Sequence, residues 1–164
     1  MPATPPIARR LNHVAYPTFD TAATTRFYTE VLGFSLVEAI RGEDRAMDGA
    51  THSFLHTFFA MGSGEIIAFF EVDGLERPTP DALPRWIRHL ALDVDSKETL
   101  FAWKAHLEAH GLKVIGPVNH DDTWLSIYFA DPNGVTLELT HQARTLDEND
   151  ARRATERVAA WAAR

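Results

Sequence analysis

The sequence predicts an α+β fold of two paired β-α-β-β-β modules that form a cupped mixed sheet, followed by a C-terminal helix. Alternating apolar and polar residues mark the strands, and apolar residues spaced three or four apart mark the helices. The same order of elements then occurs twice along the chain. At the start of each half, Leu11-Asn-His13-Val-Ala and Ile87-Arg-His89-Leu-Ala agree in kind at four of five positions. We therefore expect a duplicated module.

The first module is predicted over residues 11–73, after a Pro-rich arm at residues 1–10. A short strand begins at Leu11, and a helix follows over residues 21–32, where Asp20 is a typical N-cap and Gly33 a typical residue just past the helix end. A second strand is predicted over residues 34–40 and a polar loop over 41–50. Residues 52–61 and 65–72 then form a hairpin about Gly62-Ser63-Gly64.

Residues 74–86 contain Pro78, Pro80 and Pro84, and we interpret them as a linker. The second module is predicted over residues 87–141. It starts with a strand over residues 87–94, and a helix capped by Ser96 runs to about residue 110, before Gly111. A strand over residues 113–118 precedes a hairpin over 124–141, whose turn is Asp131-Pro-Asn-Gly134.

Residues 142–164 are predicted to form a separate C-terminal helix. Thr145 and Glu148 have the spacing of a capping box. An apolar stripe of small and aromatic residues follows at helical spacing: Ala151, Ala154, Val158 and Trp161. We expect this stripe to pack on the domain or on a second subunit, with a ligand lid as the alternative. We also expect the protein to form a homodimer.

The composition excludes several classes of function. The chain has no cysteine, so disulfides, thiolate metal sites and cysteine nucleophiles are excluded, and any metal needs His, Asp or Glu ligands. A formal net charge of −7 without a basic run argues against nucleic acid or an anionic membrane as partner. No segment has the apolar length of a signal peptide or a membrane span. We expect a soluble, cytoplasmic protein.

Two histidines and one glutamate lie opposite the apolar faces of their strands. His13 alternates with Val14, His89 alternates with Leu90, and Glu138 lies between Leu137 and Leu139. Two neutral imidazoles and one carboxylate suit a divalent first-row metal and leave positions open for water or substrate. The recurrence of the histidine at the repeated position favours such a site.

These residues resemble the vicinal oxygen chelate superfamily, which includes lactoylglutathione lyases, type I extradiol dioxygenases, fosfomycin-resistance enzymes and bleomycin-binding proteins. The resemblance covers about residues 11–141, and its most specific part runs from Ser126 to Gly134 and on to Glu138. It implies that the two modules form halves of a cup around one divalent metal, with His13, His89 and Glu138 as ligands. Fe(II) is the expected metal, with Mn(II), Ni(II) or Zn(II) as alternatives.

Residues around the expected metal indicate which branch of this superfamily the chain resembles. Lactoylglutathione lyases have a fourth ligand, a Glu in the last strand of the first module, where this chain has Ala68 or Phe70. Glu71 is near, but alternation places it on the other face. A three-ligand site with two histidines and one carboxylate is therefore expected.

The resemblance to extradiol dioxygenases extends to two more residues. Tyr128 matches the tyrosine that those enzymes place beside the substrate oxygen, and His120 lies near the position of their second-sphere histidine. One departure is that residues 73–88 lack the acid–base histidine of those enzymes, for which His52 and His56 are possible substitutes.

We thus expect an extradiol-type dioxygenase for a small catecholic or aromatic compound, in which Tyr128 and His120 are catalytic. The alternatives are a metal-dependent lyase or isomerase of the lactoylglutathione lyase type and a small-molecule-binding resistance protein.

Overall fold

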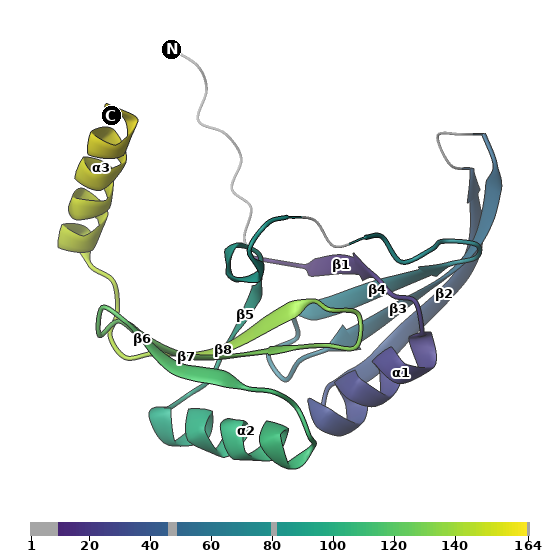
Figure 1. Ribbon diagram of the computed structural model, residues 1–164, viewed down its shortest axis with the longest axis horizontal. Coiled ribbons are helices and arrows are strands. Elements are labelled where there is room, and N and C mark those ends of the chain that lie inside the picture. The colour runs from purple at the N-terminus through teal and green to yellow at the C-terminus, as the bar shows by residue number, and fades with distance from the viewer. Residues whose placement is uncertain (1–9, 46–48, 80–81, 164) are drawn as a thin grey trace. The chain divides into compact units, whose positions relative to one another are not determined.

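The computed structural model describes residues 10–45, 49–79 and 82–163. The chain forms two compact units: unit 1 contains Met1–Pro84 and Ala130–Val135, and unit 2 contains Arg85–Phe129 and Thr136–Arg164. Each unit holds a four-stranded mixed sheet (Figure 1). The predicted α+β fold, with two β-α-β-β-β modules and a C-terminal helix, is confirmed.

Unit 1 has strands β1 (His13–Pro17), β2 (Ser35–Arg45), β3 (Thr51–Ala60) and β4 (Ile66–Val72), in the sheet order β1-β4-β3-β2. β1 runs parallel to β4, and the other pairs are antiparallel. Helix α1 (Thr21–Arg26) begins at Asp20, whose carboxylate accepts a hydrogen bond from the Ala23 N–H. It continues as a π-helix over Phe27–Val31, and Gly33 follows with a φ of 71°. The sequence therefore predicted this helical region correctly but not its change of type.

The predicted loop over residues 41–50 is partly wrong. β2 continues to Arg45, where it pairs with Thr51 of β3, and residues 46–48 lie outside the described part of the chain. The polar composition of this segment predicted a loop, but pairing with a neighbouring strand supplies backbone hydrogen bonds that local composition does not reveal.

The core of unit 1 lies between one face of its sheet and the helical segment. The fully buried Tyr28 ring lies 5.4 Å from the Phe59 ring and 4.9 Å from the Phe69 ring, measured between centroids. Ile67 is buried beside them. Because strand residues alternate between faces, this packing leaves the even-numbered residues of β3 and β4 on the opposite face.

The turn Asp131–Gly134, between β7 and β8, belongs to unit 1. The Asp131 carboxylate is buried and accepts hydrogen bonds from the backbone N–H of Asn133 and Val135 and from the Tyr28 hydroxyl. The Asn133 side-chain oxygen accepts from the Thr18 hydroxyl at 2.9 Å, and its amide donates to the Thr24 hydroxyl at 3.0 Å. The turn is therefore held by specific polar contacts rather than by its backbone alone.

Unit 2 begins with a 3₁₀ turn over Arg85–Ile87, followed by β5 (Leu90–Asp93) and helix α2 (Lys97–Ala109). Its remaining strands are β6 (Ile115–His120), β7 (Trp124–Ala130) and β8 (Thr136–Gln142), in the sheet order β5-β8-β7-β6. Helix α2 starts at Ser96, whose hydroxyl accepts from the Thr99 N–H, and buries Leu100 and Leu107. The predicted bounds of two strands were wrong. β5 starts three residues later than predicted, after the 3₁₀ turn. β6 starts at Ile115 rather than at residue 113 and extends to His120, which therefore ends a strand rather than lying in a loop.

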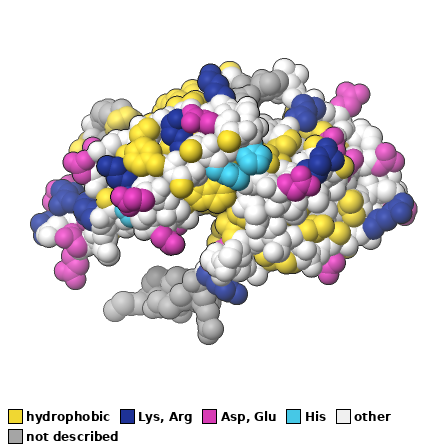
Figure 2. Space-filling view, turned by 90° about the horizontal axis from the view of Figure 1, so that it is seen from below, with side chains coloured by type: hydrophobic (Ala, Val, Ile, Leu, Met, Phe, Trp, Pro, Cys, Tyr) yellow, Lys and Arg dark blue, Asp and Glu magenta, His cyan; other side chains and the backbone are white. Residues whose placement is uncertain are grey.

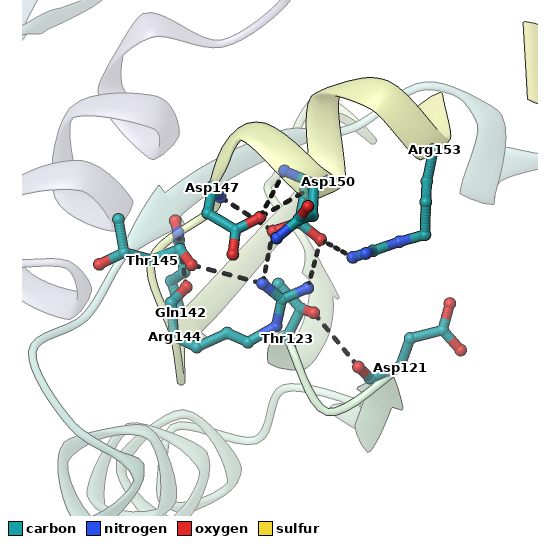
Figure 3. A network of polar contacts seen from close by, with 9 residues as sticks. Asp121, Thr123, Gln142, Arg144, Thr145, Asp147, Asp150 and Arg153 are labelled. Atoms are coloured by element: carbon teal, nitrogen blue, oxygen red, sulfur yellow. Dashed lines mark hydrogen bonds and ion pairs between the residues drawn. The ribbon is translucent and has the colours of Figure 1, made fainter. Parts of the chain in front are cut away.

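Helix α3 (Glu148–Ala162) begins at Asp147, not at Thr145 as the spacing of Thr145 and Glu148 predicted. The Asp147 carboxylate accepts from the Asp150 N–H, and the Asp150 carboxylate accepts from the Asp147 N–H, which makes a capping box (Figure 3). Arg144 donates two hydrogen bonds to Asp150, at 2.6 and 2.8 Å, and holds the pKa of this carboxyl well below its usual range. This carboxylate pair satisfies the first N–H groups of the helix, so the threonine is not needed.

No residue of α3 is buried, and Val158 and Trp161 are largely exposed. Packing of this apolar stripe on a second subunit stays a prediction. Within the described residues, none of the helices has the length and apolar character that crossing a membrane requires. On the face seen in Figure 2, basic and acidic side chains are interspersed and do not gather into a large patch of one charge.

The buried Asp131 gives a prediction about pH. Burial raises the pKa of its carboxyl above the ordinary value of 3.8, so the folded state binds this proton more tightly than the unfolded chain does. Its contribution to the free energy of unfolding is full below about pH 3.8 and is lost as the pH rises through the raised pKa. In Asp131→Asn this pH dependence disappears, so the wild type should lose stability relative to the variant as the pH rises. Urea unfolding between pH 3.5 and 7 measures the difference.

Asp121→Asn, which removes an exposed carboxylate, is the control for the loss of one negative charge and is unfolded with urea over the same pH range. A difference between wild type and Asp131→Asn that stays constant over this range contradicts the assignment.

Candidate functional site

Glu138 lies in the middle of β8 and is only 6% exposed. Strand alternation turns it away from Leu137 and Leu139, which are buried in the apolar core. A carboxylate this far from water requires hydrogen bonds or an opposite charge. Its Oε2 atom lies 2.8 Å from Nε2 of His89, and its Oε1 atom accepts a hydrogen bond of 3.0 Å from the Tyr128 hydroxyl.

His89 precedes β5 by one residue, and the 3₁₀ turn before it fixes its ring. Its Nδ1 atom lies 3.0 Å from the carbonyl oxygen of Trp86. A carbonyl accepts hydrogen bonds and does not donate them, so Nδ1 carries a proton. A neutral ring then has its lone pair on Nε2, which faces the Glu138 carboxylate.

Two acceptors 2.8 Å apart repel each other unless a positive charge lies with them. A proton on Nε2 supplies that charge, and a divalent cation bound by both groups supplies it equally. Ligands bound about 2.1 Å from one ion and at right angles to each other lie about 3 Å apart. An imidazole fixed at Nδ1 by a backbone carbonyl is also the usual arrangement of a metal-binding histidine. His89 and Glu138 therefore fit two ligands of a metal ion.

Tyr128 on β7 continues the network toward β6. Its hydroxyl hydrogen is donated to Glu138, so the contact of 2.8 Å between this oxygen and Nε2 of His120 requires His120 to be the donor. Burial raises the pKa of the Tyr128 hydroxyl, and the hydrogen bond to Glu138 and the charge of Glu138 raise it further. Tyr128 is therefore a protonated donor at neutral pH, in a chain of contacts from His120 to His89.

A pocket of about 490 Å³ lies on the same face of the unit 2 sheet. Ala91, which pairs with Glu138 in the β5–β8 ladder, lines it together with Asp93, Trp124 and Thr140. A volume of this size accommodates a small molecule. Its polar lining combines two carboxylates, a hydroxyl, an imidazole and a carboxamide, and Trp124 adds one indole.

His13 is the first residue of β1 and belongs to unit 1. Its Nδ1 atom lies 2.7 Å from the side-chain oxygen of Asn12, and its ring meets the Phe58 ring edge to face. Within each unit, the described residues form no group of three His, Asp or Glu side chains arranged to hold a metal. The structure thus brings His89, Glu138, Tyr128 and His120 together in unit 2 and places His13 in unit 1.

Sequence reasoning missed the groups that support this site. The Trp86 carbonyl was missed because a strand was predicted from residue 87, and the pocket residues Asp93 and Thr140 carried no distinguishing motif. Glu71, which was considered as a fourth ligand, accepts a hydrogen bond of 2.7 Å from the Thr21 N–H at the start of α1. It therefore lies on the α1 side of the unit 1 sheet, as alternation predicted.

The Tyr128 pKa gives a testable consequence. Replacing Glu138 with Gln removes the negative charge beside the hydroxyl, so the Tyr128 pKa should fall toward 10. ¹³C NMR titration of Cζ-labelled tyrosine measures this change. Burial and the Asp131 carboxylate raise the pKa values of Tyr16 and Tyr28, so these should titrate alike in wild type and Glu138→Gln and serve as internal controls. An unchanged Tyr128 titration contradicts the network.

Comparisons with known proteins identify the family of the chain. Residues 10–139 match the family model described as the Glyoxalase/Bleomycin resistance protein/Dioxygenase superfamily. An uncharacterized protein of Escherichia coli (strain K12), YaeR, is 31% identical over 139 residues, which cover 82% of this chain and 97% of YaeR.

An iron-dependent extradiol dioxygenase of Rhodococcus jostii (strain RHA1) is 28% identical over 158 residues, which cover 92% of this chain but 49% of the dioxygenase. The chain thus spans about half the length of that enzyme. The crystal structure of a glyoxylase/bleomycin resistance protein/dioxygenase domain from Frankia sp. EAN1pec superposes with a TM-score of 0.63 at 22% identity, covering 83% of this chain and 99% of that domain. At that identity the likeness concerns the fold.

Proposed function

Because the chain belongs to the Glyoxalase/Bleomycin resistance protein/Dioxygenase superfamily, we propose that it is a metal-dependent enzyme of the extradiol dioxygenase type. The substrate would be a small catecholic or aromatic compound. The observation that carries this proposal is the buried Glu138, which faces Nε2 of His89 on one side and the Tyr128 hydroxyl on the other. Similarity to an iron-dependent extradiol dioxygenase supports it.

His89 and Glu138 would hold one divalent ion, and we propose His13 as the third ligand because it occupies the equivalent position of the duplicated module. Fe(II) is the preferred ion, with Mn(II), Ni(II) or Zn(II) as alternatives. Held by these residues, a ferrous ion would supply the Lewis-acid and oxygen-activating chemistry that ring cleavage needs.

The protein's own groups handle the protons. Tyr128 is protonated at neutral pH and donates to Glu138 in this structure. With Glu138 bound to a cation, its hydroxyl hydrogen would turn to the substrate oxygen and so favour the developing negative charge there. His120 donates to the Tyr128 oxygen and can resupply a proton to it. The pocket beside Ala91 and Thr140 has room for the substituents of the substrate.

A lyase or isomerase of the lactoylglutathione lyase type is the second candidate, and it needs a fourth ligand from unit 1. The described residues of β4 that share a face with His13 are Ile66, Ala68, Phe70 and Val72, which have no ligating atom. The Glu71 carboxylate already accepts a hydrogen bond from the Thr21 N–H at the start of α1. These observations favour the three-ligand site. Small-molecule sequestration without chemistry is the third candidate, and homodimer formation and a cytoplasmic location stay predictions.

Metal analysis tests the ligand set. Freshly purified wild type should contain about one equivalent of metal per chain, and His13→Ala, His89→Ala and Glu138→Ala should each lose at least 90% of it, because each removes one ligand. His110→Ala, on the exposed end of α2, should keep the wild-type content. Full metal content in a folded His89→Ala or Glu138→Ala variant excludes the site.

Oxygen uptake tests the reaction. Protein loaded anaerobically with Fe(II) should consume oxygen with at least one member of a catechol panel. Tyr128→Phe should lower kcat/KM about 100-fold while keeping its metal, because it removes a proton donor and not a ligand. If the loaded wild type consumes no oxygen with any catechol, the dioxygenase assignment is wrong, and stoichiometric metal would then favour the lyase.

A further inference from the structure

The sheet of unit 1 has an uninterrupted row of aromatic rings on the face opposite its helical segment. We name it the ring row, and its members in order of contact are Phe54, Phe70, His56, Phe58 and His13. Successive ring centroids are 5.5, 3.5, 4.0 and 6.0 Å apart. Strand pairing explains the alignment, because His56 pairs with Phe70 and Phe58 pairs with Ala68, which in turn pairs with Ala15 of β1.

Gly42 of β2 completes one end of the row. It pairs with Phe54, and a Cβ atom at this position would come within 2.8 Å of the Phe54 ring. The outer edge of the Phe54 ring therefore lies close to the Gly42 backbone, and a larger residue at position 42 would displace it.

His56 is the one polar member in the middle of the row, and only 8% of it is exposed. Its Nδ1 atom lies 3.0 Å from the carbonyl oxygen of Phe69, so Nδ1 carries the proton and Nε2 of the neutral ring is an acceptor. The ring is parallel to that of Phe70, with an interplanar angle of 7°. These contacts fix both the tautomer and the orientation of the imidazole.

The Nε2 atom of His56 has no hydrogen-bond partner among the described residues. Among the described residues, the polar side-chain atoms that are both fully buried and unpartnered are the hydroxyls of Thr21 and Thr57. Nε2 of His56 is not one of them, so it is not fully buried. Nε2 is therefore within reach of solvent or of a ligand, although the rest of the ring is buried. An accessible acceptor inside an aromatic surface is complementary to a planar ring that carries a hydroxyl group.

We propose that the ring row binds a planar hydroxylated aromatic molecule, whose ring packs on Phe58 and Phe70 and whose hydroxyl donates a hydrogen bond to Nε2 of His56. This inference rests on the proposed function in one respect: it takes this molecule to be the substrate, because His13 lies at the end of the same row. Binding itself needs neither metal nor oxygen. His56 then selects hydroxylated over unsubstituted rings.

Binding to metal-free protein tests the proposal separately from turnover. The wild type, stripped with EDTA and dialysed, is titrated by calorimetry with three probes: 2-naphthol, naphthalene, which lacks the hydroxyl, and decahydro-2-naphthol, which lacks the planar ring. The 2-naphthol should bind at least ten-fold more tightly than either of the others, because only it satisfies both the rings and His56. Equal affinities, or no binding of 2-naphthol, overturn the proposal whether or not the loaded protein consumes oxygen.

His56→Phe keeps an aromatic ring and removes the acceptor, so it should lower the affinity for 2-naphthol about ten-fold and leave that for naphthalene unchanged. His52→Phe is the matched control, because it makes the same change on the same strand and face outside the ring row, and it should bind as the wild type does. Unchanged selectivity in a folded His56→Phe variant contradicts the role of His56.

If His56→Phe does not fold, ¹⁵N NMR of the wild type tests the same hydrogen bond. In ¹⁵N-labelled protein, 2-naphthol should shift the Nε2 resonance of His56 upfield, as expected when a lone pair accepts a hydrogen bond, and naphthalene should not. The His52 resonances should not move with either probe. A His56 resonance that is indifferent to saturating 2-naphthol overturns the assignment.

Discussion

A carboxylate in the interior of a sheet is the constraint around which the site of unit 2 is built. Glu138 is almost fully buried, and a charge in that position is tolerated only if neighbouring groups replace the water it has lost. Two groups meet this requirement directly: His89, just before β5, and Tyr128 of β7. His120 of β6 contacts the Tyr128 hydroxyl behind them. In the proposed function, the same groups that stabilise the charge bind a cation and move a proton. Structural necessity and chemistry therefore share one set of side chains.

The two units use a common architecture for different purposes. Each sheet places one face on a helix and keeps the other face for polar or aromatic groups. In unit 2 that second face carries a hydrogen-bonded network with a pocket beside it. In unit 1 it carries stacked rings around His56. The two modules thus share one fold and differ in the side chains on this second face.

The hairpin turn Asp131–Gly134 shows how a short motif acquires a structural role beyond reversing the chain. Its backbone requires a residue that tolerates a positive φ at position 134, and Gly134 has a φ of 86°. Its side chains do more, because Asp131 is satisfied by Tyr28 and by its own turn, and Asn133 binds two threonine hydroxyls. Part of the unit 1 polar interior thus comes from residues more than 100 positions away in the sequence.

The sequence by itself determined what depends on short-range pattern: the strands and helices, the caps at Asp20 and Ser96, and the faces on which His13, His89 and Glu138 lie. These follow from alternation and from local backbone hydrogen bonding. Only the tertiary structure decided which side chains on those faces touch, because contacts depend on strand register and on turns such as Arg85–Ile87. The Trp86 carbonyl behind His89, the 3.0 Å contact of Tyr128 with Glu138 and the stacking of His56 on Phe70 are all of this kind. The last two join side chains on different strands, and the first depends on a 3₁₀ turn where a strand had been predicted.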